Sequence, residues 1–183
     1  MPAVWVSLLR AVNLGARNKV SMSRLREVLV EAGFSDVRTY VQSGNVITRS
    51  AHRSPDRVAA AVREVIRAEF GLDVPVIVRS PQELRAVLAW CTFPADAAAR
   101  PNLVHVVHLT AEPDADKVAA LLAADWSPDA AAVRGRELVV CYAETVQRGR
   151  ISQATALRRL AVDGTARNWR TLQALVDLTA DAP

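Results

Sequence analysis

The stretch Val37-Arg-Thr-Tyr-Val-Gln-Ser-Gly-Asn-Val-Ile-Thr-Arg49 (VRTYVQSGNVITR) predicts a β-hairpin. β-Branched residues cluster on both sides of Gln42-Ser-Gly-Asn45, and serine, glycine and asparagine are residues that a tight turn accommodates. A helical pattern over 24–32 precedes the hairpin, and a second one over 55–70 follows it. A hairpin placed between two helices is the feature that decides the fold.

Two further strands complete this unit. Val4–Leu9 is a short apolar run without helical spacing, and Val74–Val78 is another. A short helix is expected after Ser80-Pro81. The order strand, helix, hairpin, helix, strand is typical of a ferredoxin-like α+β unit.

The same order of elements recurs in the second half. The first strands begin at Val4 and Leu103, 99 residues apart, and the later helices begin at Pro55 and Ile151, 96 residues apart. The elements expected there are a strand at 103–109, a helix at 114–124, a hairpin of 131–134 and 137–142 about Gly135-Arg136, and helices at 151–160 and 169–179.

We therefore predict an α+β fold that is a tandem structural duplication of two similar ferredoxin-like subdomains, with antiparallel or mixed sheets and helices. The first subdomain is expected at 1–92 and the second at 102–183. The Pro- and Ala-rich stretch 93–101 is the expected linker, and the two subdomains are expected to pack as one unit.

Charge is unevenly distributed along the chain. Residues 1–90 carry 13 Lys and Arg against 8 Asp and Glu, residues 91–133 carry 2 against 6, and residues 134–183 carry 8 against 5. The net charge of +4 thus combines two basic segments with an acidic middle. Such clustering favours an anionic partner, either a nucleic acid or a phosphorylated small molecule, without identifying it.

The apolar runs, such as Leu138–Tyr142, are far shorter than a bilayer-spanning helix. The N-terminal residues lack the charged and cleavage-site features of a signal peptide. Cys91 and Cys141 stand fifty residues apart, outside any CxxC or Cys/His cluster. We expect a cytoplasmic protein with no membrane partner, and its oligomeric state stays open.

The loop Arg10-Ala-Val-Asn-Leu-Gly-Ala-Arg-Asn-Lys-Val-Ser-Met22 joins the first strand to the first helix. Its single glycine, Gly15, fits neither GxxxxGK[ST] nor GxGxxG. The loop nevertheless lies before a helix N-terminus, a position that attracts anions, and its cations can donate to a phosphate. Alternatively, its asparagines make local turn hydrogen bonds. The candidate ligand-binding residues of the loop are Arg10, Asn13, Arg17, Asn18 and Lys19.

Two more polar segments offer candidates, namely the hairpin turn and the C-terminal TARNWRT. In the latter, two arginines flank a tryptophan that could stack on a base. Each segment also has a structural interpretation: tight-turn geometry for the hairpin, a helix N-cap for Asn168 and an apolar anchor for Trp169. The candidates from these segments are Gln42, Ser43, Asn45, Arg167, Asn168, Trp169 and Arg170.

Metal and hydrolase chemistry find little support in the sequence. His105 and His108 point to opposite faces of one predicted strand, so they do not form a metal-ligating pair. Ser43 has no basic partner near it in the sequence. We expect no metal and no cofactor, and we assign no catalytic residue.

Three segments together resemble the bacterial family called domain of unknown function 1697. The family pattern is roughly LLRGINVGGxNKVxM, GFxxVRTYxQSGNVxF and TxRNWxT, and the chain has LLRAVNLGARNKVSM, GFSDVRTYVQSGNVIT and TARNWRT. The resemblance spans nearly the whole chain. It implies an α+β fold of two similar ferredoxin-like subdomains, and it implies no activity.

Three of the departures from the family pattern bear on ligand binding. Ala11 and Ala16 stand where the family has glycines, which makes a close backbone approach to a phosphate less easy. Gln153 stands where a lysine is usual in a family G-x-x-SKL region; if that lysine serves a ligand in the family, its replacement argues against the same role in this chain.

Three functions are compatible with these observations. The first is a protein that binds an anionic ligand, nucleic acid or nucleotide, through its polar and basic loops. The second is a small-molecule enzyme with a cleft between the subdomains, and the third is a non-catalytic scaffold. Asparagines that are buried and bonded to the backbone would favour the third. The residues that the enzyme would use are Arg10, Asn13, Lys19, Ser43 and Asn45.

Overall fold

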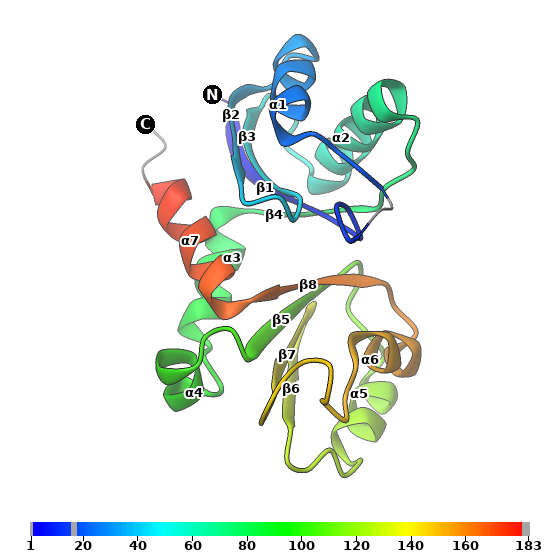
Figure 1. The fold of residues 1–183 in the computed structure, drawn as a ribbon, viewed down its shortest axis with the longest axis vertical. Helices are drawn as coiled ribbons and strands as arrows, with labels where there is room; N and C mark the ends of the chain where they lie inside the picture. Colours follow the sequence, from blue (N-terminus) through cyan, green and yellow to red (C-terminus); the bar gives the residue numbers. More distant parts are fainter. Residues whose placement is uncertain (1, 16–17, 181–183) are drawn as a thin grey trace. The chain divides into compact units, whose positions relative to one another are not determined.

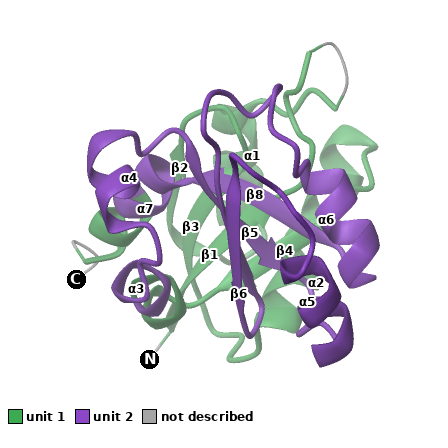
Figure 2. Ribbon diagram, turned by 90° about the horizontal axis from the view of Figure 1, so that it is seen from below, with its two compact units in different colours: residues 1–85, 175–183 green, residues 86–174 purple. Residues whose placement is uncertain are grey.

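The computed structural model describes residues 2–15 and 18–180. The chain forms two compact units, one of residues 1–85 with 175–183 and the other of residues 86–174. Figure 2 shows the two units in different colours.

The first unit is a four-stranded antiparallel sheet with two helices. The strand order is β2-β3-β1-β4, and every neighbouring pair is antiparallel. Figure 1 shows α1 and α2 on the same face of this sheet. This is the ferredoxin-like arrangement. The elements are β1 (Ala3–Leu9), α1 (Met22–Glu31), β2 (Ser35–Tyr40), β3 (Asn45–Ser50), α2 (Pro55–Phe70) and β4 (Val76–Arg79).

The ends of both helices follow from local sequence. The Ser21 side chain accepts a hydrogen bond from the backbone N–H of Arg24, which caps α1. Pro55 occupies the first turn of α2, and Gly71 ends that helix at φ +65°. The apolar stripes of the two helices and one face of the sheet enclose the core of this unit.

The second unit repeats the order of the first. Its sheet has the order β6-β7-β5-β8, in which each strand occupies the position of its counterpart in the order β2-β3-β1-β4 of the first sheet. Its neighbouring pairs are also antiparallel. Helices α5 and α6 cover one face (Figure 1). The elements are α4 (Pro94–Ala99), β5 (Val104–Leu109), α5 (Ala115–Leu122), β6 (Ala130–Arg134), β7 (Glu137–Cys141), α6 (Gln153–Leu160) and β8 (Gly164–Asn168).

The predicted tandem duplication of ferredoxin-like units is confirmed, and two elements were missed. β8 (GTARN) lacks the apolar run that identifies a strand, and α4 lies within the stretch expected to be a linker. Two other helices, α3 (Pro81–Ala89) and α7 (Trp169–Ala180), contribute residues to both units. The subdomain bounds 1–92 and 102–183 stay a prediction.

Candidate functional site

Asn13 ties the first loop to the hairpin turn of the first unit. Its Nδ2 donates to the carbonyl oxygens of Val20 (2.9 Å) and Gln42 (2.8 Å), and its Oδ1 accepts from the backbone N–H of Val20 (2.9 Å). Both N–H groups and the oxygen of this carboxamide are therefore used within the unit. The two polar segments, which are 29 residues apart in the sequence, form one structure.

The other two asparagines of these segments are also bonded locally. Asn18 donates from Nδ2 to the carbonyl of Ala11 at 3.0 Å. Asn45 is fully buried and donates to the carbonyl of Tyr40 (3.1 Å) and to Ser43 Oγ (3.0 Å). These bonds favour a structural role for the asparagines.

Gly44 fits closely beneath the loop. The backbone N–H of Leu9 donates to its carbonyl at 2.8 Å, and its φ is +76°. A Cβ at this position would lie 2.5 Å from Val12 Cγ2 and 2.7 Å from Leu9 Cβ. The turn therefore requires glycine both for its backbone conformation and for space.

The loop contains a left-handed residue that is neither glycine nor asparagine. Ala11 has φ +54°, and the asparagines Asn13 and Asn18 have φ +55° and +49°. Asparagine tolerates this region, whereas alanine is strained there.

We expect Ala11→Gly to raise the free energy of unfolding by about 0.5 to 1 kcal/mol, because relief of strain exceeds the added chain entropy of glycine. Urea unfolding followed by circular dichroism measures the change. Ala60→Gly, within α2, is the control, and its free energy of unfolding should fall by about 1 kcal/mol. Equal losses in both variants would contradict the strain assigned to Ala11.

The remaining candidates of the first unit differ in exposure. Arg10 is half-buried, whereas Lys19, Gln42 and Ser43 are exposed. Arg17 lies outside the described residues. Of these side chains, Gln42 lines a hollow that was not expected from the sequence.

This hollow has a volume of about 320 Å³ and lies beside the N-terminus of α1. Its lining includes hydroxyls, a carboxamide and one guanidinium, but no carboxylate, and the first turn of α1 has no acidic residue. The N–H groups of a first helical turn carry partial positive charge, which favours an anion. The lining residues are Ser21, Met22, Ser23, Arg26, Thr39, Val41 and Gln42.

Arg26 is the cation of this hollow. Its Nη1 donates to Thr39 Oγ1 at 2.7 Å, and it has no carboxylate partner among the residues that the structure describes. Arg24, on the same helix, contrasts with it. A hydrogen bond to Glu69 raises the pKa of Arg24 above its usual value, and further carboxylates add to this effect. Arg26 is thus a half-buried cation whose charge no described acidic group balances.

The C-terminal candidates lie in the second unit. Arg167 is 7% exposed and donates from Nη1 to Thr165 Oγ1 (2.9 Å) and to the carbonyl of Ala166 (2.8 Å). Burial lowers its pKa to about 10, so it remains a cation at neutral pH. Asn168 Oδ1 accepts from the backbone N–H of Thr171 at 2.9 Å, which confirms the predicted cap of α7. Trp169 is buried and Arg170 is exposed.

A buried polar row crosses the second sheet. His108 Nδ1 lies 2.7 Å from Glu137 Oε2, and Thr165 lies opposite His108 on β8. Carboxylate, imidazole and hydroxyl resemble the order of a hydrolytic triad. However, the Thr165 hydroxyl accepts from Arg167, while His108 is 0% and Thr165 3% exposed. This row is therefore closed to a substrate.

His105 lies on the other side of the same strand. Its Nε2 donates to the carbonyl of Asn102 at 3.0 Å, and its ring packs edge-on against Tyr142. Burial lowers the pKa of His105 below its usual value. Within residues 2–15 and 18–180, no cluster of three or more His, Cys, Asp or Glu side chains could hold a metal ion.

The matching strand orders of the two units place the protein among α+β proteins built from two ferredoxin-like units. A family profile described as Protein of unknown function (DUF1697) matches residues 3–138. The chain belongs to this family, as the motifs predicted; the matched residues contain the first two motifs, and TARNWRT lies after them.

Comparison with solved structures finds a conserved bacterial protein from Streptococcus pneumoniae. The TM-score is 0.70, the identity is 18%, and the match covers 97% of this chain and 99% of that chain. At this identity the likeness shows the fold alone. Comparison with curated proteins finds no match.

None of the helices in the described part of the chain is both long and apolar enough to cross a membrane.

Proposed function

We propose that the first unit binds a phosphate-bearing small molecule of the nucleotide class in the hollow beside α1. The observation that carries the proposal is Arg26, a cation without a described carboxylate partner in a polar hollow free of lining acids. Guanidinium groups bind phosphate oxygens through paired N–H donors. Arg26 uses one of its nitrogens on Thr39, which orients the group and leaves the other N–H groups for a ligand.

The rest of the hollow suits such a ligand. The hydroxyls of Ser21 and Ser23 lie 2.9 Å apart at the start of α1, and Gln42 adds a carboxamide. Lys19 is exposed two residues before Ser21 and can add charge. In this proposal Asn13 does not touch the ligand but holds the Gln42 backbone in place.

Size favours a small molecule over a nucleic acid duplex. A volume of about 320 Å³ accommodates a phosphate with one adjoining sugar or ring. A protein that neutralises several backbone phosphates would show a steep dependence of affinity on salt. A single bound phosphate group predicts a shallow one.

Arg26→Gln is expected to weaken the binding of adenosine 5′-monophosphate by about 10- to 100-fold, because a charge-assisted hydrogen bond is lost. Isothermal titration calorimetry at several salt concentrations measures the affinity and its salt slope. Inorganic phosphate serves as the minimal probe.

The matched control is Arg57→Gln, which removes one exposed positive charge from α2, outside the hollow. It should leave the affinity within about twofold of the wild type. An equal loss of affinity in the two variants would mean that net charge alone weakens binding, which would contradict the proposed site. Tight binding of single-stranded DNA with a steep salt slope would favour the nucleic acid alternative.

A cytoplasmic location belongs to the same proposal. Cys91 and Cys141 are both free thiols, which suits a reducing compartment.

A further inference from the structure

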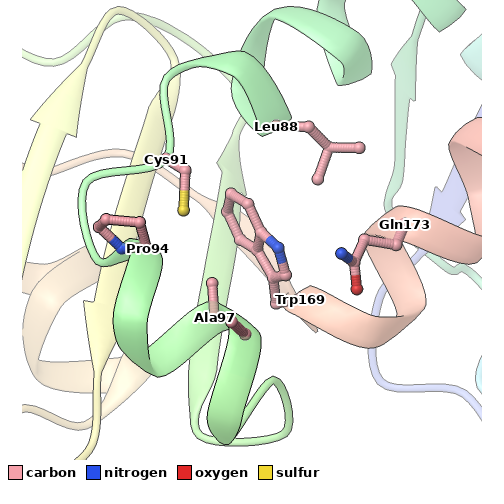
Figure 3. Close-up of a pocket in the computed structure, with 7 residues that line it drawn as sticks. Leu88, Cys91, Pro94, Ala97, Trp169 and Gln173 are labelled. Atoms are coloured by element: carbon pink, nitrogen blue, oxygen red, sulfur yellow. The ribbon is translucent and has the colours of Figure 1, made fainter.

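A second hollow, of about 270 Å³, lies in the second unit. The end of α3, the helix α4 and the first turn of α7 line it (Figure 3). Its lining residues are Leu88, Cys91, Pro94, Ala97, Ala98, Trp169 and Gln173.

Local sequence builds this hollow around Trp169. The backbone N–H of Trp169 donates to the carbonyl of Pro101 at 3.1 Å, and Asn168 caps the helix that Trp169 begins. Pro94 starts α4, and the small side chains of Ala97 and Ala98 leave space beside the indole ring. The ring is thus held in place by its backbone while one side of it borders a space that no side chain fills.

The chemistry of the lining is apolar and uncharged. No Lys, Arg, Asp or Glu contributes to it. Figure 3 shows the Cys91 sulfur and the Gln173 carboxamide on opposite sides of the Trp169 ring, with the indole nitrogen turned toward Gln173. A hollow with these walls favours a neutral, mainly apolar ligand.

The indole N–H of Trp169 points to what such a ligand carries. Trp169 is 4% exposed, and its Nε1 donates to no acceptor among residues 2–15 and 18–180, although the nitrogen atom itself is not fully buried. In contrast, Trp5 Nε1 donates to the carbonyl of His52 at 3.0 Å and Trp126 Nε1 to that of Leu121 at 2.8 Å. Trp90, the fourth tryptophan, also has no described acceptor for its indole N–H, but it is only half-buried. The indole N–H of Trp169 is therefore available to donate to an acceptor on a ligand in the hollow.

We infer that this hollow is a binding site for a small neutral aromatic molecule that bears a hydrogen-bond acceptor. The ligand lies in the hollow against Trp169, and its acceptor, on the Gln173 side of the ring, receives the Trp169 indole N–H. A benzene molecule fills an engineered cavity of about 150 Å³, so about 270 Å³ takes one ring with a short substituent. This site is separate from the phosphate site proposed in the first unit, and it does not depend on it.

Acetophenone and ethylbenzene form a matched pair of probes, because they have nearly the same shape and only the first has a carbonyl acceptor. Each is titrated into the full-length, ¹⁵N-labelled protein while the indole N–H resonances are recorded. Acetophenone should shift the Trp169 resonance and leave those of Trp5 and Trp126 in place. It should bind about 2- to 10-fold more tightly than ethylbenzene, the effect of one hydrogen bond.

Two substitutions on α4 separate the hollow from the helix surface. Ala98→Leu fills the hollow and should abolish binding of both probes, whereas Ala95→Leu is the same change on the same helix outside the lining and should leave binding intact. Trp169→Phe keeps a ring but removes the N–H, and it should reduce acetophenone to the affinity of ethylbenzene.

Three results would overturn the inference. The first is an absence of any shift at millimolar acetophenone, which would leave water as the acceptor of the indole N–H. The second is equal affinity of the two probes for the wild type. The third is unchanged binding in Ala98→Leu.

Discussion

Gly44→Ala should destabilise the first unit by about 3 kcal/mol or more. The added Cβ would lie 2.5 Å from Val12 Cγ2 and 2.7 Å from Leu9 Cβ, and Leu9 belongs to the central strand β1. Neither atom can retreat easily, because Leu9 and Val12 are buried in the core. The φ of +76° adds backbone strain to this clash. Urea unfolding measured by circular dichroism gives the change in stability.

Gly33→Ala is the matched control for this prediction. Gly33 has φ +89°, but a Cβ there would meet nothing within 4 Å. Its substitution therefore tests the backbone penalty alone and should cost about 1 to 2 kcal/mol. An equal loss of stability in the two variants would contradict the steric clash that we expect at position 44.

Asn13→Ala is expected to cost about 2 to 3 kcal/mol of stability, because it removes three hydrogen bonds and leaves backbone groups of Val20 and Gln42 without them. Alanine would also be strained at φ +55°. Chemical unfolding again provides the measurement. Asn18→Ala has almost the same backbone strain but loses a single side-chain bond, to the carbonyl of Ala11, and should cost about half as much.

The same variant separates the scaffold role of Asn13 from a ligand role. At a temperature where Asn13→Ala is fully folded, its affinity for adenosine 5′-monophosphate should stay within about threefold of the wild type, because Asn13 acts on the hollow only through the Gln42 backbone. Normal stability combined with lost ligand binding would reverse this assignment and place Asn13 in contact with the ligand.

The architecture could be predicted from the sequence because its signals are periodic and local. Pro55 and Gly71 mark the two ends of α2, and β-branched residues cluster on both sides of the 42–45 turn. The duplication followed from the order of elements rather than from sequence identity. β8 was not predicted, because its five residues, GTARN, pair with β5 through the backbone and contain no apolar run.

The candidate site was less predictable for a physical reason. A carboxamide can form the same hydrogen bonds with a ligand as with the backbone. The sequence of the loop therefore does not reveal which of the two Asn13 binds. Its partner Gln42 is 29 residues away in the sequence. Arg26 gave no signal either, because it lies on the polar side of an amphipathic helix, where most arginines are solvated. Only its position across from Thr39 reveals it.

The most direct test of the proposed function is a titration of the ¹⁵N-labelled protein with inorganic phosphate, followed through its backbone amide resonances. Phosphate bound in the hollow should cause saturable shifts at Met22 and Ser23 in the first turn of α1 and at Gln42, and these shifts should be lost in Arg26→Gln. Shifts that are absent from α1, or that persist unchanged in Arg26→Gln, would contradict it.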